Sequence, residues 1–244
     1  MYVASQGNDT VPGTVSVIAT ASNAVIAQIT VGLQPIAFGI FITPEVQSAP
    51  ASGTSCNGVF NGTFMGDITV SAGQDCTFID GGQVIGNVNV LPGGHFSGTG
   101  TKITKNVTIS GPLTTWSMVR NTVGGNAQVQ NIPDPPASPT NFMCGTTVNG
   151  DLQFQNNGTA VQIGSADPLI CAGNTIGGNL QVNNNTSTVL IFDNVVGNDL
   201  QVGNNTGALD VVGNNVGGNL QCQGNSMLIM GGMNTAKQTE GQCN

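Results

Sequence analysis

The chain has 244 residues, of which only four are Lys or Arg and twelve are Asp or Glu, so its formal net charge is −8. Proteins that hold nucleic acid neutralise phosphates with clustered basic side chains, and no such cluster occurs here, so we expect no nucleic-acid partner. The sequence has a single His, and no His and Cys residues show metal-ligand spacing, so we expect neither a metal nor a cofactor.

The chain begins with a β-rich segment, residues 1–46, that lies outside the repeat of the later sequence. Residues 24–43 are apolar over nearly the length of a membrane span, but polar residues and turn breaks interrupt them, so we favour strands and expect no transmembrane segment. Residues 1–5 lack the basic start and apolar run of a signal peptide, so we expect a secreted chain to begin upstream. Strands are predicted at residues 14–20, 24–32 and 35–45.

Three apolar residues of this segment, Phe38, Ile40 and Ile42, alternate onto one side of their strand. A small sheet with two open edges is marginal alone and prone to pair with other strands. We therefore interpret these three residues as assembly residues and the segment as an assembly arm. It docks either on the rest of its own chain or on a neighbouring molecule. Residues 47–55, which are rich in Ser and Ala, form the linker that follows.

The N-terminal segment also has a familiar pattern. Tyr-Val-Ala-Ser at residues 2–5, Val-Ser-Val-Ile at 15–18 and Thr-Pro-Glu at 43–45 resemble one blade of the YVTN-type β-propeller repeat of surface-layer and secreted prokaryotic proteins. The resemblance covers residues 2–44 and implies a blade-like sheet. A propeller needs several blades and here there is one, so either partner blades have been removed or the sheet docks on something else.

From residue 64 to residue 222 the sequence repeats a unit of about 20 residues, in which Asn or Asp precedes an apolar, polar, apolar triplet. Dense Gly and Asn exclude helices, so each unit fits one coil of a stack whose equivalent residues lie about 4.8 Å apart. The sequence therefore predicts an all-β fold, a parallel β-solenoid (β-helix) of about eight coils over residues 56–244, preceded by the blade-like β-sheet segment. The inner ladder of this solenoid is predicted to contain Ile68, Val88, Val107, Ala127, Leu152, Leu180, Leu200 and Leu220.

Alternation of side chains along a strand places Leu180 and Val182 inward and Gln181 outward. A second inward pair recurs nine to eleven residues after each centre, as Trp116 and Met118 do, which predicts a second face. Asn tolerates left-handed corners, and stacked amides can bond from coil to coil. Two Asn ladders are therefore predicted, one of Asn174, Asn194 and Asn214 and one of Asn157, Asn185, Asn205 and Asn225.

The six cysteines fall on positions that coil stacking brings together. Stacked Cα atoms about 5 Å apart lie within disulfide range, so the register selects one pairing among those that six cysteines allow. The alternative is free buried thiols that fill core positions. Disulfides indicate an extracellular or cell-surface protein, and the last pair would cap the C-terminal end of the solenoid. The predicted disulfides are Cys56–Cys76, Cys144–Cys171 and Cys222–Cys243.

The solenoid sequence has a resemblance of its own. Ile-Gly-Gly-Asn-Leu-Gln-Val at 176–182, Val-Gly-Gly-Asn-Leu-Gln-Cys at 216–222 and the ending Thr-Glu-Gly-Gln-Cys at 239–243 are similar to secreted bacterial repeat proteins of the GGNLQC type. The resemblance covers residues 57–243. It implies secretion and a C-terminal disulfide, and it implies no activity.

Two longer coils carry insertions near residues 132–141 and 165–173. Proline cannot join a strand ladder, so we expect loops there. Loops on a rigid scaffold often bind ligands, although surface insertions without function are also tolerated at little cost. Trp116 and Arg120 lie near the first insertion and form the predicted ligand loop. The site of a polysaccharide lyase or hydrolase would have to form at the same place.

The sequence contains few other residues of the types that act in catalysis, and we expect no enzyme activity. His95 follows Pro-Gly-Gly at a corner and is interpreted as a solvated turn residue. Asp67, Asp151 and Asp199 share a corner position that Asn occupies in other copies. This exchange indicates corner-forming hydrogen bonds rather than Ca²⁺ coordination.

Two functional hypotheses remain. The first is an extracellular structural protein that assembles head to tail into a filament or surface array. In this homopolymer the N-terminal segment and the solenoid ends would join successive subunits. The alternative is a monomeric cell-surface adhesin that presents its amide ladders or its loops to glycans.

Overall fold

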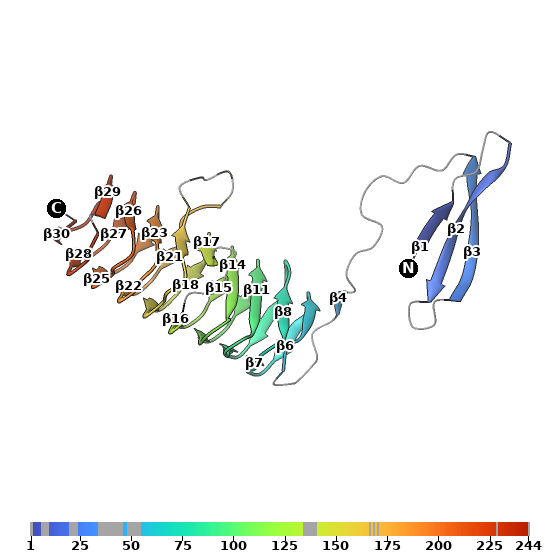
Figure 1. The fold of residues 1–244 in the computed structure, drawn as a ribbon, viewed down its shortest axis with the longest axis horizontal. Helices are drawn as coiled ribbons and strands as arrows, with labels where there is room; N and C mark the ends of the chain where they lie inside the picture. The colour runs from blue at the N-terminus through green and yellow to red at the C-terminus, as the bar shows by residue number, and fades with distance from the viewer. Residues whose placement is uncertain are drawn as a thin grey trace. The chain divides into compact units, whose positions relative to one another are not determined.

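The chain folds into two units (Figure 1). In the computed structural model, contacts group Met1–Val46 into one unit and Gln47–Asn244 into the other. Strands are the regular secondary structure of both units. The structure describes residues 2–5, 10–19, 24–33, 46–47, 55–133, 141–165, 167, 169, 171–227 and 229–243.

The N-terminal unit contains an antiparallel sheet in the order β1 (Tyr2–Ser5), β2 (Pro12–Ala19) and β3 (Ala24–Leu33). Its strands are rich in the β-branched residues Val, Ile and Thr, which favour strands. The first ten residues of the membrane-like stretch are therefore strand, as the sequence predicts. The predicted assembly residues Phe38, Ile40 and Ile42 lie outside the described residues.

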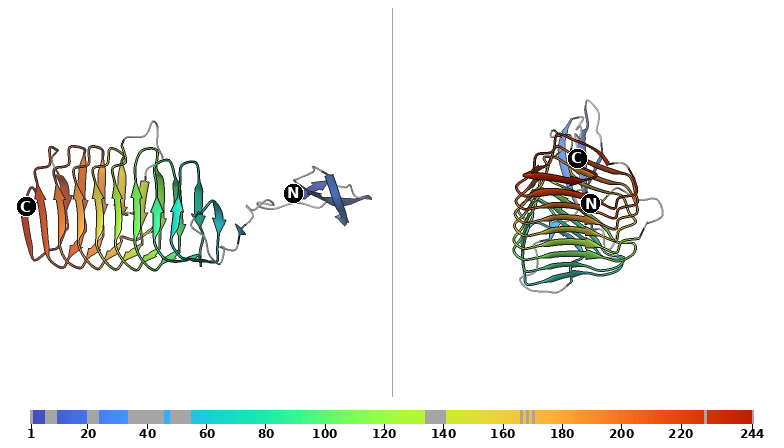
Figure 2. Two further views of the ribbon diagram at one scale, coloured as in Figure 1. Left: turned by 90° about the horizontal axis from the view of Figure 1, so that it is seen from below. Right: turned by 90° about the vertical axis from the view of Figure 1, so that its left-hand side faces the viewer.

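The larger unit is a parallel β-solenoid whose coils stack along one axis (Figure 2). Most coils contribute one strand of two to five residues to each of three sheets. Of the described residues, sheet 1 contains β7 (Ile68–Val70), β10 (Val88–Val90), β13 (Val107–Ser110), β16 (Ala127–Gln130), β19 (Leu152–Gln155), β22 (Leu180–Asn183), β25 (Leu200–Gly203), β28 (Asn219–Gln223) and β30 (Gln238–Gly241).

The other two sheets follow the same coil order. Within the described part of the chain, sheet 2 contains β4 (Val46–Gln47), β5 (Gly58–Phe60), β8 (Asp75–Phe78), β11 (His95–Thr99), β14 (Thr115–Val119), β17 (Asn141–Cys144), β20 (Val161–Gly164), β23 (Val189–Phe192), β26 (Leu209–Val212) and β29 (Ile229–Gly232). Sheet 3 contains β6 (Thr63–Met65), β9 (Gln83–Ile85), β12 (Lys102–Ile103), β15 (Thr122–Val123), β18 (Thr147–Val148), β21 (Thr175–Ile176), β24 (Val195–Val196) and β27 (Asn215–Val216).

The predicted parallel β-solenoid is confirmed, with two differences in its coils. The sequence predicts two faces, whereas the structure has three. The residue that opens each repeat, such as Ile176, is the one inward residue of a short strand of sheet 3. The sequence also predicts about eight coils, whereas the structure has about nine turns, because β30 continues sheet 1 without the repeat motif.

The core is built from ladders of apolar side chains that run along the solenoid. Leu180, Leu200 and Leu220 pair in register and are at most 1% exposed. The residue after each of them, for example Gln201, is half-buried and faces outward. Each fully buried Leu contributes about 2 kcal/mol relative to an exposed one, so the sum over many coils stabilises the rod.

Two further ladders consist of buried Asn side chains, at the corners before and after sheet 2. Asn194 Oδ1 accepts both the backbone N–H and the side-chain N–H of Asn174, at 3.0 and 2.9 Å. Asn194 Nδ2 then donates to the carbonyl oxygen of Ile163 at 3.0 Å. The same pattern repeats in Asn174, Asn194, Asn214 and Asn234 and in Asn157, Asn185, Asn205 and Asn225. These bonds satisfy polar groups that the core would otherwise leave without partners.

A ladder of Asn and Asp with half-buried and exposed members runs along the corner between sheets 3 and 1. Here each side chain accepts the backbone N–H of the next coil, as Asp199 Oδ1 does from Asn219 at 2.8 Å. Only an acceptor oxygen is required, so Asp can replace Asn at this corner. In this coil a glycine lies two residues before the ladder residue Asp199. A Cβ at Gly197 would overlap the carbonyl oxygen of Gly177 in the previous coil.

Three disulfides join stacked coils, and they are the pairs that the coil register predicts. The Cα–Cα distances are 5.3 Å for Cys56–Cys76, 5.8 Å for Cys144–Cys171 and 5.3 Å for Cys222–Cys243. In the chain-entropy description, a loop of this size contributes about 3 kcal/mol through the unfolded state.

The buried and exposed ladders should respond differently to the same substitution. We expect Asn194→Asp to lower the free energy of unfolding by about 3 kcal/mol or more, because a carboxylate would face the Ile163 carbonyl inside the core. The matched control is Asn106→Asp on the exposed corner, which keeps the oxygen that accepts the Asn126 N–H at 2.8 Å. We expect this control to lose about 1 kcal/mol or less. Denaturant unfolding measures both values, and equal losses would contradict the proposed role of the buried amides.

Candidate functional site

The C-terminal end of the solenoid contains a hollow where the core ladders stop. Gly231 stacks on Val211 in sheet 2, and Thr239 stacks on Leu220 in sheet 1. Among the described side chains of the last turn, no large apolar one therefore stacks on either core residue. An open cavity of about 240 Å³ lies at this end, and Val211 and Leu220 are buried at its base, with exposed fractions of 0% and 1%.

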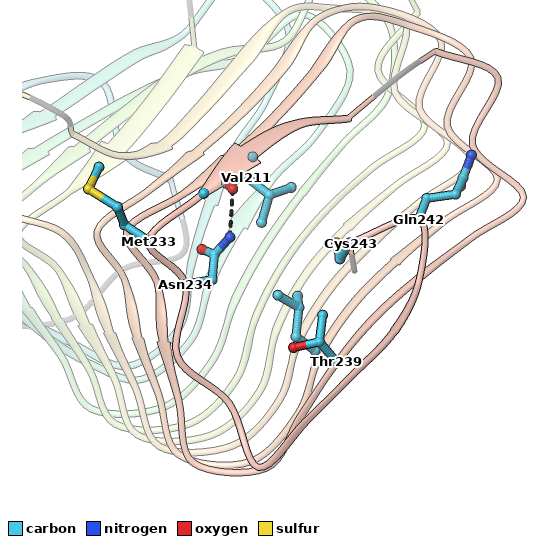
Figure 3. Close-up of a pocket in the computed structure, with 9 residues that line it drawn as sticks. Val211, Met233, Asn234, Thr239, Gln242 and Cys243 are labelled. Atoms are coloured by element: carbon cyan, nitrogen blue, oxygen red, sulfur yellow. Dashed lines mark hydrogen bonds between the residues drawn. The ribbon is translucent and has the colours of Figure 1, made fainter.

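The rim of this end hollow carries polar and flexible groups (Figure 3). Asn234 lies at one side, with its side-chain amide donating to the Val211 carbonyl oxygen at 2.8 Å. Thr239 and Cys243 lie across from it, and Met233 stands 84% exposed at the edge. The hollow thus combines the exposed apolar side chain of Met233 with groups able to make hydrogen bonds, which are features of a docking site for a side chain of another segment.

At this end of the solenoid, Gln242 and Glu240 make the hydrogen bonds that a further Asn or Gln would make in the ladders. Gln242 Oε1 accepts the backbone N–H of Asn225 at 2.9 Å, and Gln242 Nε2 donates back to the Asn225 carbonyl oxygen at 2.7 Å. Glu240 accepts the side-chain amide of Gln221 at 3.2 Å. Polar capping and the last disulfide therefore hold the final turn in place, while β29 and β30 remain the last strands of their sheets in the described part of the chain.

The N-terminal sheet exposes a large amount of apolar surface. The residues of β3 are exposed apart from half-buried Val31, and the large apolar side chains Val25, Ile26, Ile29 and Leu33 are 52–65% exposed. Soluble proteins seldom leave a long apolar strand uncovered in this way. This surface is a second candidate interface, and it lies in the same segment as the predicted assembly residues.

The predicted ligand loop of Trp116 and Arg120 does not form as expected. Trp116 points into the core, is 2% exposed and packs against Phe154 with ring centroids 5.8 Å apart. This placement corrects the expectation that Trp116 meets a ligand, and it agrees with the inward register of the second face. Arg120 is exposed at a corner with a left-handed φ of 55°, and its stem lies beside Gly145 next to the Cys144–Cys171 disulfide.

His95 has a more structured environment than the sequence suggests. It begins β11 rather than lying in the turn, and stacking places it between Asp75 and Thr115. Its Nδ1 lies 2.6 Å from Thr115 Oγ1, and its Nε2 lies 3.9 Å from Asp75 Oδ1. Acid, imidazole and hydroxyl are thus in line, but the Asp75 side chain is 68% exposed. A catalytic acid that orients a histidine is normally buried and hydrogen-bonded to it, so this row is best described as an outward polar ladder.

The corner carboxylates bind backbone groups of the protein itself. Asp67 Oδ1 accepts the backbone and side-chain N–H groups of Asn87 at 2.8 and 3.0 Å. These two bonds, with a smaller contribution from the Lys105 charge, hold the pKa of the Asp67 carboxyl below its ordinary value. Among the described residues, no group of three or more His, Cys, Asp or Glu is arranged to hold a metal ion.

Comparison of the chain with protein-family models, with curated proteins and with solved structures finds no match. Among the residues that the structure describes, there is no helix with enough length and apolar character to cross a membrane.

The Asp67 bonds predict a specific response to acid. Because the pKa is lowered in the folded state, Asp67 stabilises the fold above its unfolded pKa of about 3.9, and this contribution is lost as the pH falls through the lower folded pKa. Asp67→Asn should therefore show a smaller drop in melting temperature between about pH 4 and pH 2 than the natural chain. Asp210→Asn, on the outer face of sheet 2, is the control. An unchanged acid response in Asp67→Asn would contradict this assignment.

Proposed function

We propose that this protein is an extracellular structural protein that assembles head to tail, with the N-terminal sheet of one molecule added to the C-terminal end of the next. The observation that carries the proposal is that one chain has both an exposed apolar strand and an open hollow that could receive a side chain. β3 exposes the apolar side chain of Ile29, and the last turn of the solenoid has an open hollow beside strand edges.

Strand addition explains how the two features would join. Backbone groups of a sheet edge supply affinity when another strand pairs with them, and pockets for alternate side chains supply specificity. A side chain seated in the end hollow would contact the exposed residues Gly231 and Thr239, which stack on Val211 and Leu220. A contact between different surfaces of identical molecules does not close on itself, so repetition leads to a filament or an array.

An extracellular location is part of the same proposal. The three disulfides are consistent with an oxidising compartment, where such bonds persist. The role is structural, and the proposed assembly requires no catalytic residue. Glycans remain a candidate partner of the assembled surface.

Truncation tests the role of the N-terminal sheet. We expect the full chain to sediment as oligomers whose size grows with concentration, and the chain lacking residues 1–50 to remain a folded, disulfide-bonded monomer. Analytical ultracentrifugation measures both. If the truncated chain assembles as well as the full chain, the solenoid ends alone join the subunits. If the full chain stays monomeric at high concentration, the assembly proposal is wrong.

Point variants separate the two surfaces. Thr239→Lys places a long charged side chain in the hollow and should weaken association at least about tenfold, as should Ile29→Lys on the exposed strand. The adjacent variants Gln238→Lys and Gln28→Lys, on the opposite face of each strand, are the matched controls. Equal association of all four variants would contradict the proposed contact.

A further inference from the structure

A second, smaller cavity lies on the outer face of sheet 1, away from the end hollow. Along this face one outward row contains Gln130, Gln155, Asn183, Gly203 and Gln223 in successive coils. Gly203 is the member without a side chain, so it interrupts the row. The interruption opens a notch of about 220 Å³ lined by Asn183, Gln201, Val202, Gly203, Asn204, Gln221 and Gln223.

The side chains at this amide notch are held in place by a chain of hydrogen bonds. Gln181 Nε2 donates to Gln201 Oε1 at 3.1 Å, Gln201 Nε2 donates to Gln221 Oε1 at 3.2 Å, and Gln221 Nε2 donates to Glu240 Oε2 at 3.2 Å. The two central glutamines are half-buried, so these bonds orient their amides before any ligand arrives.

The same bonds leave unused hydrogen-bonding capacity on the amides that line the notch. A primary amide has two N–H donors and two acceptor lone pairs. The row consumes one donor and one acceptor of Gln201 and of Gln221, so each retains one of both kinds. Asn183 and Gln223 add further amides from the neighbouring row. The notch thus offers paired donors and acceptors on a rigid sheet, without a charged side chain in its lining.

We propose that this amide notch binds a neutral, hydroxyl-rich glycan chain. A sugar hydroxyl is both a donor and an acceptor, which matches an amide that retains one group of each kind. Coils repeat at about 4.8 Å, and an extended β-1,4-linked pyranose chain advances by a similar distance per sugar, so successive sugars would face successive amides. The notch would admit one ring substituent, such as a hydroxymethyl or an acetamido group. This binding needs only a single molecule and is independent of head-to-tail assembly.

The test is a titration of the full chain with cellotetraose and, separately, with tetra-N-acetylchitotetraose, followed by amide chemical shifts. We expect a dissociation constant on the order of 1 mM, because the notch has no aromatic ring on which a sugar could stack. The two probes distinguish a hydroxyl-only glycan from one that carries acetamido groups. Binding of either probe with shifts centred on Gly203 supports the proposal.

Variants locate the site. Gly203→Gln should weaken binding at least about tenfold by filling the notch. The close contact of its Cβ would be with the end of the Asn183 side chain at 2.8 Å, since the Gln223 carbonyl oxygen lies at an ordinary 3.7 Å, and Gln occupies the same row in other coils, so we expect the variant to fold. Gln201→Leu should also weaken binding, whereas Gln128→Leu, on the same face away from the notch, should not. Failure of both probes to bind at about 10 mM, or equal binding by Gly203→Gln and the natural chain, would overturn the proposal.

Discussion

The fold depends on hydrogen bonds between stacked Asn side chains and backbone N–H groups of the neighbouring coil. Every coil must turn sharply three times, and each corner removes backbone groups from the strand ladders. Buried Asn residues such as Asn185 supply the missing acceptors, with the Asn157 N–H donating to Asn185 Oδ1 at 3.0 Å. The apolar ladders stabilise the core but do not select one register of the coils. The amides do require one register, because a slip of one residue would leave several buried polar groups without hydrogen-bond partners.

A ladder that satisfies each coil through its neighbour is satisfied everywhere except at its ends. The molecule closes its C-terminal end with different chemistry. Gln242 reproduces the amide of the missing Asn, and Glu240 accepts the last Gln of the outward row. The apolar ladder ends differently, since the smaller residues Gly231 and Thr239 stack on Val211 and Leu220 and leave a hollow outside them. The end hollow and the proposed assembly both follow from this difference between polar and apolar capping.

The outer surface follows the same stacking. Side chains of one row lie one coil apart, so a change at a single position produces a local feature in an otherwise regular surface. The amide notch arises in this way from Gly203, and the exposed corner accepts Asp at positions such as Asp151 because only an acceptor is needed there. The scaffold therefore separates stability, which resides in the interior, from surface features that can change independently.

Much of this architecture could be predicted from the sequence because the period places equivalent residues on top of one another. Leu180, Leu200 and Leu220 were identifiable as one inward ladder, and the cysteine pairs followed from the same register. Sheet 3 was not recognised, because strands such as β21 carry a single inward residue and show no alternation.

Other features escaped prediction for different physical reasons. The sequence predicts Trp116 both as an inward core residue and as part of a ligand loop, and only its burial in the structure decides between these two roles. The end hollow depends on Gly231 and Thr239, which lie beyond the last recognisable repeat. The functional assignment could not come from the period, since stacking specifies shape and not a partner.

Amide hydrogen exchange of the buried corners tests the central claim most directly. The backbone N–H groups of Asn174, Asn185 and Asn194 donate to side-chain oxygens rather than to strand carbonyls. If the Asn ladders hold the fold together, these amides should exchange as slowly as the strand amide of Leu200 and only through global unfolding. Leu169, whose N–H bonds within an exposed loop, provides the fast reference. Exchange of the three corner amides at the rate of Leu169 would contradict the account.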